Sequence, residues 1–262
     1  PILMGVINLT PDSFSDGGQY NKNNSGFNHA NYLIKKGSKI LDIGGESTRP
    51  GAKGINKITE WKRINKTLKK ISKLNTFISL DTRKSWIMEK GIKNKVNLIN
   101  DVSGFEYDEN TINVLKTHKI PFVIHHMKGT PENMQKNPNY KNVLLDIYDF
   151  FENKIKKLRS LGIKHNNIIL DPGIGFGKNL KHNITLINNI SIFHSLGFPI
   201  MLGISRKRFI KDLSGNNDSK ERLGGTISSS LFAMNQGIQI LRIHNINEVN
   251  QSIKVFKSLN LK

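Results

Sequence analysis

Polar residues that could do chemistry stand at the ends of eight short apolar runs spread along this sequence. They include acids, bases and amides, and they are Asn8, Asp42, Arg49, Asp81, Asn100, Asp101, His125, His126, Asp171, Ser205, Arg206, Lys207, Arg242 and His244. The arginines suit a phosphorylated or pyrophosphorylated substrate, because one guanidinium group can contact two phosphate oxygens. The acids and the Asn100 amide offer acceptors and donors for a flat, polar heterocycle. The residue types therefore predict a substrate that combines the two.

Several of these residues also have a structural interpretation. A carboxylate at a strand end often caps a helix or anchors a loop, which is the alternative for Asp42 and Asp101. His125 and His126 point to opposite sides of a strand, so at most one faces a barrel interior, and such a histidine is more often a hydrogen-bonded structural group than a ligand. No pair of histidines has the spacing of a known metal site such as H-E-x-x-H.

The apolar runs indicate which elements position these residues. They are nearly continuous in Ile, Val and Leu, as expected for strands buried on both faces of a parallel sheet. We expect strands at residues 2–8, 39–45, 77–81, 97–104, 121–127, 168–173, 199–205 and 240–245, with helices between them that include 60–74, 143–161, 182–196 and 221–236. Eight such units predict an α/β fold, the (β/α)8 TIM barrel, with its site at the carboxyl ends of the strands. An open doubly wound sheet is the alternative.

Length and composition agree with this fold. The chain has 262 residues, and one such barrel needs about 250. No linker or low-complexity tract divides it, so we expect a single domain over residues 1–262. The absence of cysteine excludes disulfides, Cys-ligated zinc, iron–sulfur clusters and thiol catalysis. No apolar run reaches the roughly 18 residues of a membrane span, and the first residues lack a secretory signal pattern, so we expect a cytoplasmic protein with no membrane partner.

The formal net charge of +20 invites a nucleic-acid interpretation. However, 32 of the 40 basic residues are lysines, and the chain also contains 32 asparagines, a joint excess that points to compositional drift in an A/T-rich genome. The lysines are scattered over amphipathic stretches, where solvated helix faces lie. We therefore expect anionic small-molecule substrates and no nucleic-acid partner.

A glycine-rich segment at residues 173–178 follows the sixth predicted strand. Its spacing matches neither the P-loop, G-x-x-x-x-G-K-[ST], nor the dinucleotide motif, G-x-G-x-x-G. It is instead predicted to be a loop of close backbone approach whose aromatic residue, Phe176, could lie over a planar ring.

Three segments carry a more specific signal. They are MGVINLTPDSFSDGG at 4–18, DIGGESTRPGA at 42–52, and DPGIGFGK at 171–178 followed by GISRK at 203–207. Together they closely resemble the dihydropteroate synthases, the folate-pathway enzymes that are the target of sulfonamides. The resemblance runs through the whole chain, in register with all eight predicted strands.

This resemblance implies a transferase reaction and its site. The amine of p-aminobenzoate attacks the methylene of 6-hydroxymethyl-7,8-dihydropterin pyrophosphate, which yields 7,8-dihydropteroate and pyrophosphate. The pterin side comprises Asp81, Asn100, Met127, Asp171, Phe176, Gly203 and Lys207. The pyrophosphate side comprises Arg242, His244 and Asn8, of which Asn8 would hold Mg²⁺. The p-aminobenzoate side comprises Thr48, Arg49, Pro50 and Ser205. A closing loop contains Asp12, Phe14, Ser15 and Asp16.

The resemblance also implies a division of labour and an assembly. It makes Asp81, Lys207, Arg242 and His244 the candidate catalytic residues, with Asp81 near the charge that develops on the pterin ring and the cations at the leaving group. No protein nucleophile is required. A homodimer is expected, and its interface cannot be located from the periodicity.

The sequence departs from the family pattern at one position, and one other function competes with this interpretation. Asn245 follows His244 where the family commonly has an acid, which puts a supporting partner of the phosphate-facing residues in doubt. The rival is a pterin-binding barrel that transfers a methyl group from methyltetrahydrofolate to a corrinoid. That enzyme would share the acid–Asn–acid pattern but would need neither the Ser-Thr-Arg-Pro loop nor the Arg-x-His pair.

Overall fold

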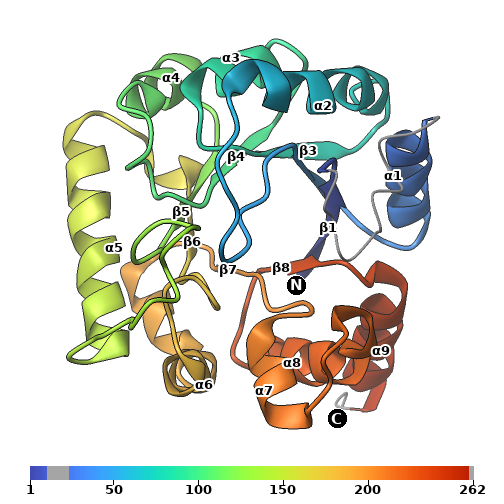
Figure 1. The fold of residues 1–262 in the computed structure, drawn as a ribbon, viewed down its shortest axis with the longest axis vertical. Helices are drawn as coiled ribbons and strands as arrows, with labels where there is room; N and C mark the ends of the chain where they lie inside the picture. The colour runs from blue at the N-terminus through green and yellow to red at the C-terminus, as the bar shows by residue number, and fades with distance from the viewer. Residues whose placement is uncertain (11–23, 260–262) are drawn as a thin grey trace.

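A computed structural model describes residues 1–10 and 24–259 as eight parallel strands ringed by helices (Figure 1). The strands are β1 (Ile2–Asn8), β2 (Ile40–Gly44), β3 (Phe77–Asp81), β4 (Leu98–Asp101), β5 (Phe122–His125), β6 (Ile168–Asp171), β7 (Met201–Leu202) and β8 (Ile240–Ile243). All eight predicted strands are confirmed. Most are shorter than predicted, and β7 keeps only two residues because the flanking residues turn into loops.

The sheet order is β6-β5-β4-β3-β2-β1-β8-β7, with every neighbouring pair parallel. A single bridge between Leu170 and Ile200 joins the two ends of this order and nearly closes the ring. The fold is therefore the predicted (β/α)8 barrel, and the open doubly wound sheet is excluded. All carboxyl ends of the strands meet on one rim.

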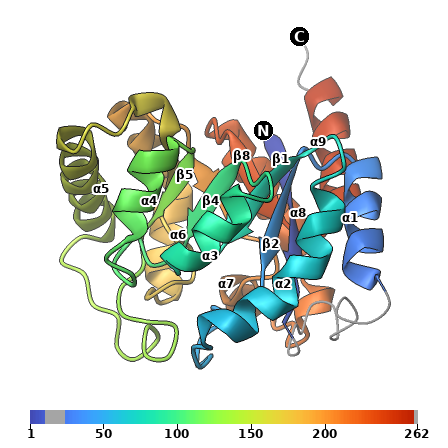
Figure 2. The same cartoon turned by 90° about the horizontal axis from the view of Figure 1, so that it is seen from above.

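Helices surround the barrel and cover its outer face (Figures 1 and 2). They are α1 (Ser25–Lys35), α2 (Lys57–Ile71), α3 (Ser85–Ile92), α4 (Thr111–His118), α5 (Val143–Ser160), α6 (Leu180–Asn188), α7 (Arg208–Ser214), α8 (Leu223–Asn235) and α9 (Ile246–Leu259). The predicted helix at 182–196 is two elements, because α6 ends at Asn188 and a 3₁₀ helix (Ile190–Leu196) follows.

Helix α2 illustrates why these segments are helical. Its amphipathic pattern buries Ile64, Leu68 and Ile71 against the barrel, and the Asn56 side chain caps its start by accepting a hydrogen bond from the Thr59 N–H at 2.8 Å. Lysines fill its outer face. The main hydrophobic core lies between such helices and the outward-facing residues of the strands.

Side chains inside the barrel form two layers, because every second strand residue points inward. The lower layer is an apolar cluster of Met4, Leu98, Val123, Met201 and Ile240. On β4 and β8 the inward side chain two residues further along is polar, Asn100 after Leu98 and Arg242 after Ile240, and with the buried Asp42, Asp81 and Asp171 these form the upper layer. The strands thus carry a polar site on an apolar base.

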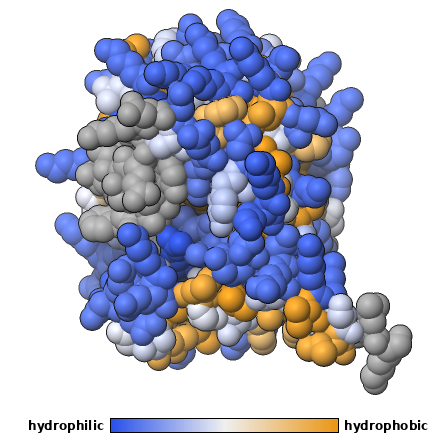
Figure 3. Space-filling model, turned by 90° about the vertical axis from the view of Figure 1, so that its right-hand side faces the viewer, coloured by the Kyte–Doolittle hydropathy of each residue, from blue (hydrophilic) through white to orange (hydrophobic). Residues whose placement is uncertain are grey.

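The outer surface is mostly hydrophilic on the side that includes α1 and α9, with an apolar band along its lower edge (Figure 3). Within residues 1–10 and 24–259, no helix is long and apolar enough to cross a membrane.

Candidate active site

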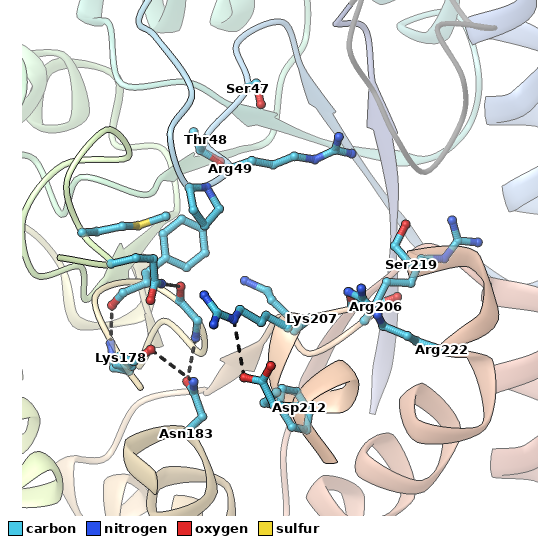
Figure 4. A pocket seen from close by; sticks show the side chains of 18 of the residues that line it. Ser47, Thr48, Arg49, Lys178, Asn183, Arg206, Lys207, Asp212, Ser219 and Arg222 are labelled. Carbon is cyan, nitrogen blue, oxygen red and sulfur yellow. Dashed lines mark hydrogen bonds and ion pairs between the residues drawn. The ribbon is translucent and has the colours of Figure 1, made fainter. Parts of the chain in front are cut away.

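A pocket of about 800 Å³ opens at the carboxyl ends of the strands. Ten residues predicted for the site line it, namely Asn8, Thr48, Arg49, Pro50, Asp81, Phe176, Ser205, Lys207, Arg242 and His244. In Figure 4, Thr48 and Arg49 lie on one side of the opening and Lys207 on the other. The topology thus gathers residues that are up to 236 positions apart in the chain, from Asn8 to His244.

An ion cluster occupies the floor of this pocket. The Arg242 guanidinium donates from Nε to Asp42 Oδ2 at 2.6 Å and from Nη2 to Asp81 Oδ2 at 2.9 Å. Asn100 Nδ2 donates to the same Asp42 oxygen at 3.2 Å. Asp42 is therefore neither a helix cap nor a loop anchor, because it fixes Arg242 between two carboxylates.

The floor keeps unused hydrogen-bonding capacity. Asp42 Oδ1 and Asn100 Oδ1 are buried and have no hydrogen-bond partner within the described part of the chain. Burial raises the pKa of Asp81 to about 7, against the opposing effect of Arg242. Buried polar atoms without partners are costly, so they are typical of a site that a ligand completes.

Lys207 and the glycine-rich loop form a second wall. Lys207 Nζ donates to the Ile174 carbonyl at 2.8 Å and lies 4.2 Å from the centre of the Phe176 ring. Desolvation lowers the pKa of Lys207 to about 7, although Asp171 opposes this shift. The loop needs glycine at position 173, where φ is +69° and a Cβ would come within 1.9 Å of a carbonyl oxygen.

His244 and Ser205 form a third group. Ser205 Oγ accepts from the His244 backbone N–H at 3.2 Å and lies 3.0 Å from His244 Nδ1. Desolvation, reinforced by the Arg206 and Arg242 cations, holds the pKa of His244 well below its usual range. The imidazole is therefore neutral at neutral pH.

Arg206 stands between these groups in an unusual backbone conformation, with φ at +60°. Its N–H donates to Thr226 Oγ1 at 3.1 Å, its carbonyl accepts from Arg222 Nη1 at 2.9 Å, and its Nε donates to Asn245 Oδ1 at 2.8 Å. A left-handed non-glycine residue costs roughly 1–2 kcal/mol, so these contacts hold the segment that presents Ser205 and Lys207. Asn245, the departure from the family pattern, keeps a supporting role through Arg206.

Four predicted residues do not line the pocket. Asn100 and Asp171 are buried beneath it, at 1% and 3% exposure. Gly203 lies beside Arg242, where an added Cβ would be 4.0 Å from the arginine side chain, and Met127 is half-buried at the end of β5. The predicted closing-loop residues Asp12, Phe14, Ser15 and Asp16 lie outside the described residues.

The structural interpretation holds for three polar residues. Asp101 anchors a loop, since its Oδ1 accepts from the Ser103 N–H at 2.8 Å and from Ser103 Oγ at 2.6 Å. His125 Nδ1 contacts the Val102 carbonyl at 3.0 Å, and His126 Nδ1 contacts Lys178 Nζ at 2.9 Å. Both histidines are hydrogen-bonded structural groups.

Other lining residues carried no assigned role in the sequence. Lys178 closes the glycine-rich motif and is 2% exposed, with its ammonium on the Phe176 carbonyl at 2.9 Å. Arg222 reaches the pocket from the turn before α8, and no motif or period marks it. Glu46 stands inside the DIGGESTRPGA segment, and its position there was the available signal.

Comparison with known proteins identifies the family. The model of the pterin-binding enzyme family matches residues 4–244. A dihydropteroate synthase of Neisseria meningitidis serogroup B is 39% identical to this chain, covering 100% of it and 93% of the relative, and that of Escherichia coli is 35% identical, covering 98% and 91%.

Solved structures agree with these relatives. The Yersinia pestis dihydropteroate synthase, in complex with a sulfonamide drug, superposes with a TM-score of 0.95 at 33% identity, covering 99% of this chain and 94% of that one. The Thermus thermophilus enzyme in complex with 4-aminobenzoate gives a TM-score of 0.88 at 33% identity, covering 98% and 94%. This chain therefore belongs to the pterin-binding enzymes and, among them, to the dihydropteroate synthase family of folate-pathway transferases.

Proposed function

We propose that the pocket binds 6-hydroxymethyl-7,8-dihydropterin pyrophosphate and p-aminobenzoate and joins them. In this reaction the C–O bond between the pterin methylene and the pyrophosphate breaks. The amine nitrogen of p-aminobenzoate bonds to the same carbon and loses one proton. The products are 7,8-dihydropteroate and pyrophosphate.

One observation carries this assignment of roles: a polar floor for a heterocycle and a cationic site for phosphates share one pocket. The pterin floor comprises Asp81 in the pocket lining with Asn100 and Asp171 buried beneath it, and the cationic site beside it comprises His244 and Arg242, which is hydrogen-bonded to Asp81. Thr48, Arg49 and Pro50 form the opposite wall. The methyltransferase alternative would need neither that wall nor the Arg242–His244 pair.

The floor supports recognition of the pterin. The unsatisfied Asn100 Oδ1 and the Asp81 and Asp171 carboxyl groups are acceptors that match ring N–H and amino donors. Burial raises the pKa of Asp171 to about 6, so at neutral pH it is mostly an anion. An anionic Asp81 beside the ring would stabilise the positive charge that develops as pyrophosphate leaves.

Two side chains suit the leaving pyrophosphate. Arg242 offers a guanidinium fork to phosphate oxygens. When the Ser205 hydroxyl donates a hydrogen bond to His244 Nδ1, the neutral imidazole carries its proton on Nε2, and this N–H can donate a hydrogen bond to phosphate. Both groups act by position and fixed charge, and neither becomes covalently attached.

Mg²⁺ fits the chemistry of this site as an ion held jointly by protein and substrate. No three His, Asp, Glu or Cys side chains gather as a metal site among residues 1–10 and 24–259. However, Mg²⁺ takes few protein ligands where phosphates complete its coordination, and Asn8 offers an amide oxygen at the pocket wall. Asn8 would hold the ion, whose charge would neutralise the departing pyrophosphate.

The wall formed by Thr48, Arg49 and Pro50 suits p-aminobenzoate together with the facing Phe176. Arg49 supplies a cation for its carboxylate, and Pro50 and Phe176 supply apolar surface for its ring. Lys207, which contacts Phe176, also lines the pocket. The residue pattern therefore supports an amine held near the reacting methylene.

The experiment is to measure dihydropteroate formation from the pterin pyrophosphate and labelled p-aminobenzoate, with and without Mg²⁺. Mg²⁺-dependent product that a sulfonamide competes away is the expected result. A folded protein that binds the pterin pyrophosphate tightly but forms no product would contradict the proposal.

The surface supports assembly as a homodimer. The neighbouring helices α7, α8 and α9 expose Leu213 (63%), Phe232 (46%) and Val255 (55%), and the apolar band in Figure 3 lies on this part of the molecule. Exposed apolar side chains gathered on adjacent helices are typical of subunit contacts. Light scattering should give twice the 29.6 kDa chain mass, and Phe232→Lys should lower it; a monomeric wild-type chain at micromolar concentration would exclude the dimer.

A further inference from the structure

One carboxylate fastens both ends of the loop between β2 and α2, residues 46–55. Glu46, at the first position of this loop, accepts through Oε1 from the Ile55 backbone N–H at 2.9 Å. Its Oε2 accepts from Arg83 Nε at 3.0 Å and Nη2 at 2.7 Å, and Oε1 also accepts from Lys84 Nζ at 2.8 Å. Four donors therefore converge on a side chain that is 2% exposed.

One further side chain, Glu60, extends this contact into a cluster at the base of the loop, the base cluster, which we define as Glu46, Glu60, Arg83 and Lys84. Lys84 Nζ bridges from Glu46 to Glu60 Oε2 at 2.6 Å. Glu60, on the first turn of α2, is fully buried and also accepts from Thr82 Oγ1 at 2.6 Å. The two acids and two bases balance in charge, and all four side chains are at least nine-tenths buried.

The base cluster joins two sides of the pocket. The loop it closes carries Thr48, Arg49 and Pro50, which line the proposed p-aminobenzoate wall. Its cations follow Asp81 within three residues, on the segment that leaves β3. The loop is therefore fixed to the element that ends in the pterin floor.

We propose that Glu46 is a positioning residue, which holds this loop so that Thr48, Arg49 and Pro50 are preorganised for p-aminobenzoate. The inference rests on the proposed function of the pocket. Ordering a loop residue costs about 1–2 kcal/mol of conformational entropy, so a loop already held by its ends loses less when the ligand binds.

A purely stabilising role is the competing interpretation. Buried ion networks are often no more stabilising than apolar side chains of similar size, so stability alone explains the base cluster poorly. The two acids also differ in their partners, since both accept from Lys84 Nζ but Glu46 in addition accepts from the loop backbone at Ile55.

The test compares Glu46→Gln and Glu46→Ala with wild type in the full chain. The KM for p-aminobenzoate should rise about tenfold to a hundredfold, as expected when a charge-assisted hydrogen bond is lost. The dissociation constant for the pterin pyrophosphate, measured by calorimetry, should change less than threefold. Glu46→Gln keeps an oxygen for the Ile55 N–H, so it should be the milder variant.

Glu106→Gln provides a matched control. It also removes an acid paired with a buried lysine, Lys154, but it lies outside the pocket lining. Its KM for p-aminobenzoate should equal that of wild type. An unchanged KM in folded Glu46→Ala, or an equal loss of affinity for both substrates, would overturn the inference.

A second measurement does not depend on turnover. Lys53 is exposed within the loop, so trypsin should cut after it faster in the Glu46 variants, with cleavage after Lys116 unchanged. If wild type forms no dihydropteroate, the proposed function fails. The cleavage rates after Lys53 then test by themselves whether Glu46 holds the loop. Equal cleavage after Lys53 in wild type and Glu46→Ala would overturn it.

Discussion

The two layers of the barrel interior differ in chemistry although two strands, β4 and β8, contribute a side chain to each. The lower layer, Met4, Leu98, Val123, Met201 and Ile240, is apolar, and its side chains pack on one another. The upper layer, Asp42, Asp81, Asn100, Asp171 and Arg242, holds four ionisable side chains and leaves Asp42 Oδ1 and Asn100 Oδ1 without a hydrogen-bond partner among the residues that the structure describes. On β4 and β8, two residues along the strand separate the lower-layer side chain from the upper-layer one.

The two layers contribute to the free energy of folding with opposite signs. Buried apolar contacts in the lower layer stabilise the fold, with about 25 cal/mol per Å² of apolar surface removed from water. The upper layer contains unsatisfied Asp42 and Asn100 oxygens, each of which opposes folding by roughly 1–3 kcal/mol. The site therefore lowers the stability of the fold, and the apolar lower layer compensates for this cost, as expected of a pocket that binds a polar ligand.

The largest effect should follow from Arg242→Ala. This change removes the cation shared by Asp42 and Asp81 and the proposed phosphate contact, so the affinity for pterin pyrophosphate should fall about a hundredfold to a thousandfold. Binding of p-aminobenzoate, measured by calorimetry, should weaken much less. Arg159→Ala is the control, because the Arg159 guanidinium donates to the Ile163 carbonyl outside the pocket. If Arg242→Ala lowers the affinity for both substrates equally, the assignment is refuted.

Leu98 and Asn100 on β4 allow the comparison of layers to be made on one strand. Leu98→Ala should lower the free energy of unfolding by about 2–5 kcal/mol, because it opens a cavity in the lower layer, while pterin affinity stays within about threefold. Asn100→Ala should do the opposite, with a stability change under about 1 kcal/mol and a pterin affinity at least tenfold weaker.

Denaturant unfolding and calorimetry on both variants decide this prediction. If Asn100→Ala loses as much stability as Leu98→Ala and keeps its pterin affinity, the upper layer is ordinary core.

The sequence predicts the two layers unequally. Its apolar runs identified all eight strands, because strands buried on both faces are apolar throughout. Residue types and motifs placed Asp81, Lys207 and Arg242 at one rim. They could not reveal that Arg242 bridges Asp42 and Asp81, since that contact joins residues 200 and 161 positions apart and depends on barrel closure.

The missed residues have the same explanation. Arg222 enters the pocket from a turn with no repeat or motif, and only the tertiary fold brings it to the Arg206 carbonyl. The helix predicted at 182–196 divides at Asn189, although its apolar period continues, because the chain tightens there into a 3₁₀ turn.

The pH dependence of the reaction should report the upper layer directly. In the free enzyme Asp81 must be ionised and Lys207 protonated, and both have a pKa of about 7. The value of kcat/KM should therefore fall on both sides of neutral pH, by up to tenfold per unit. Lys207→Arg should lose the alkaline limb, because guanidinium stays charged. A flat profile between pH 6 and pH 8, or an alkaline limb kept by this variant, would contradict these roles.

The pH dependence of stability reports the same carboxyl group without turnover, and Asp81→Asn isolates this effect. The carboxyl group has a pKa of about 7 in the folded chain and 3.8 as its ordinary value, and burial is the main cause. Between these values the folded state binds a proton that the unfolded state has lost, so this group's contribution to stability is greatest below pH 4 and is lost as the pH rises through 7.

Asparagine cannot titrate, so the stability of Asp81→Asn relative to wild type should increase from pH 4 to pH 7, by at most about 1.4 kcal/mol per pH unit, and stay constant above pH 8. Urea unfolding at several pH values measures this slope. Asp212→Asn, a surface acid in an exposed pair with Arg208, should show no such trend. If Asp81→Asn gives a relative stability independent of pH, then Asp81 is already ionised at pH 4, and the upper layer stores less strain than its geometry indicates.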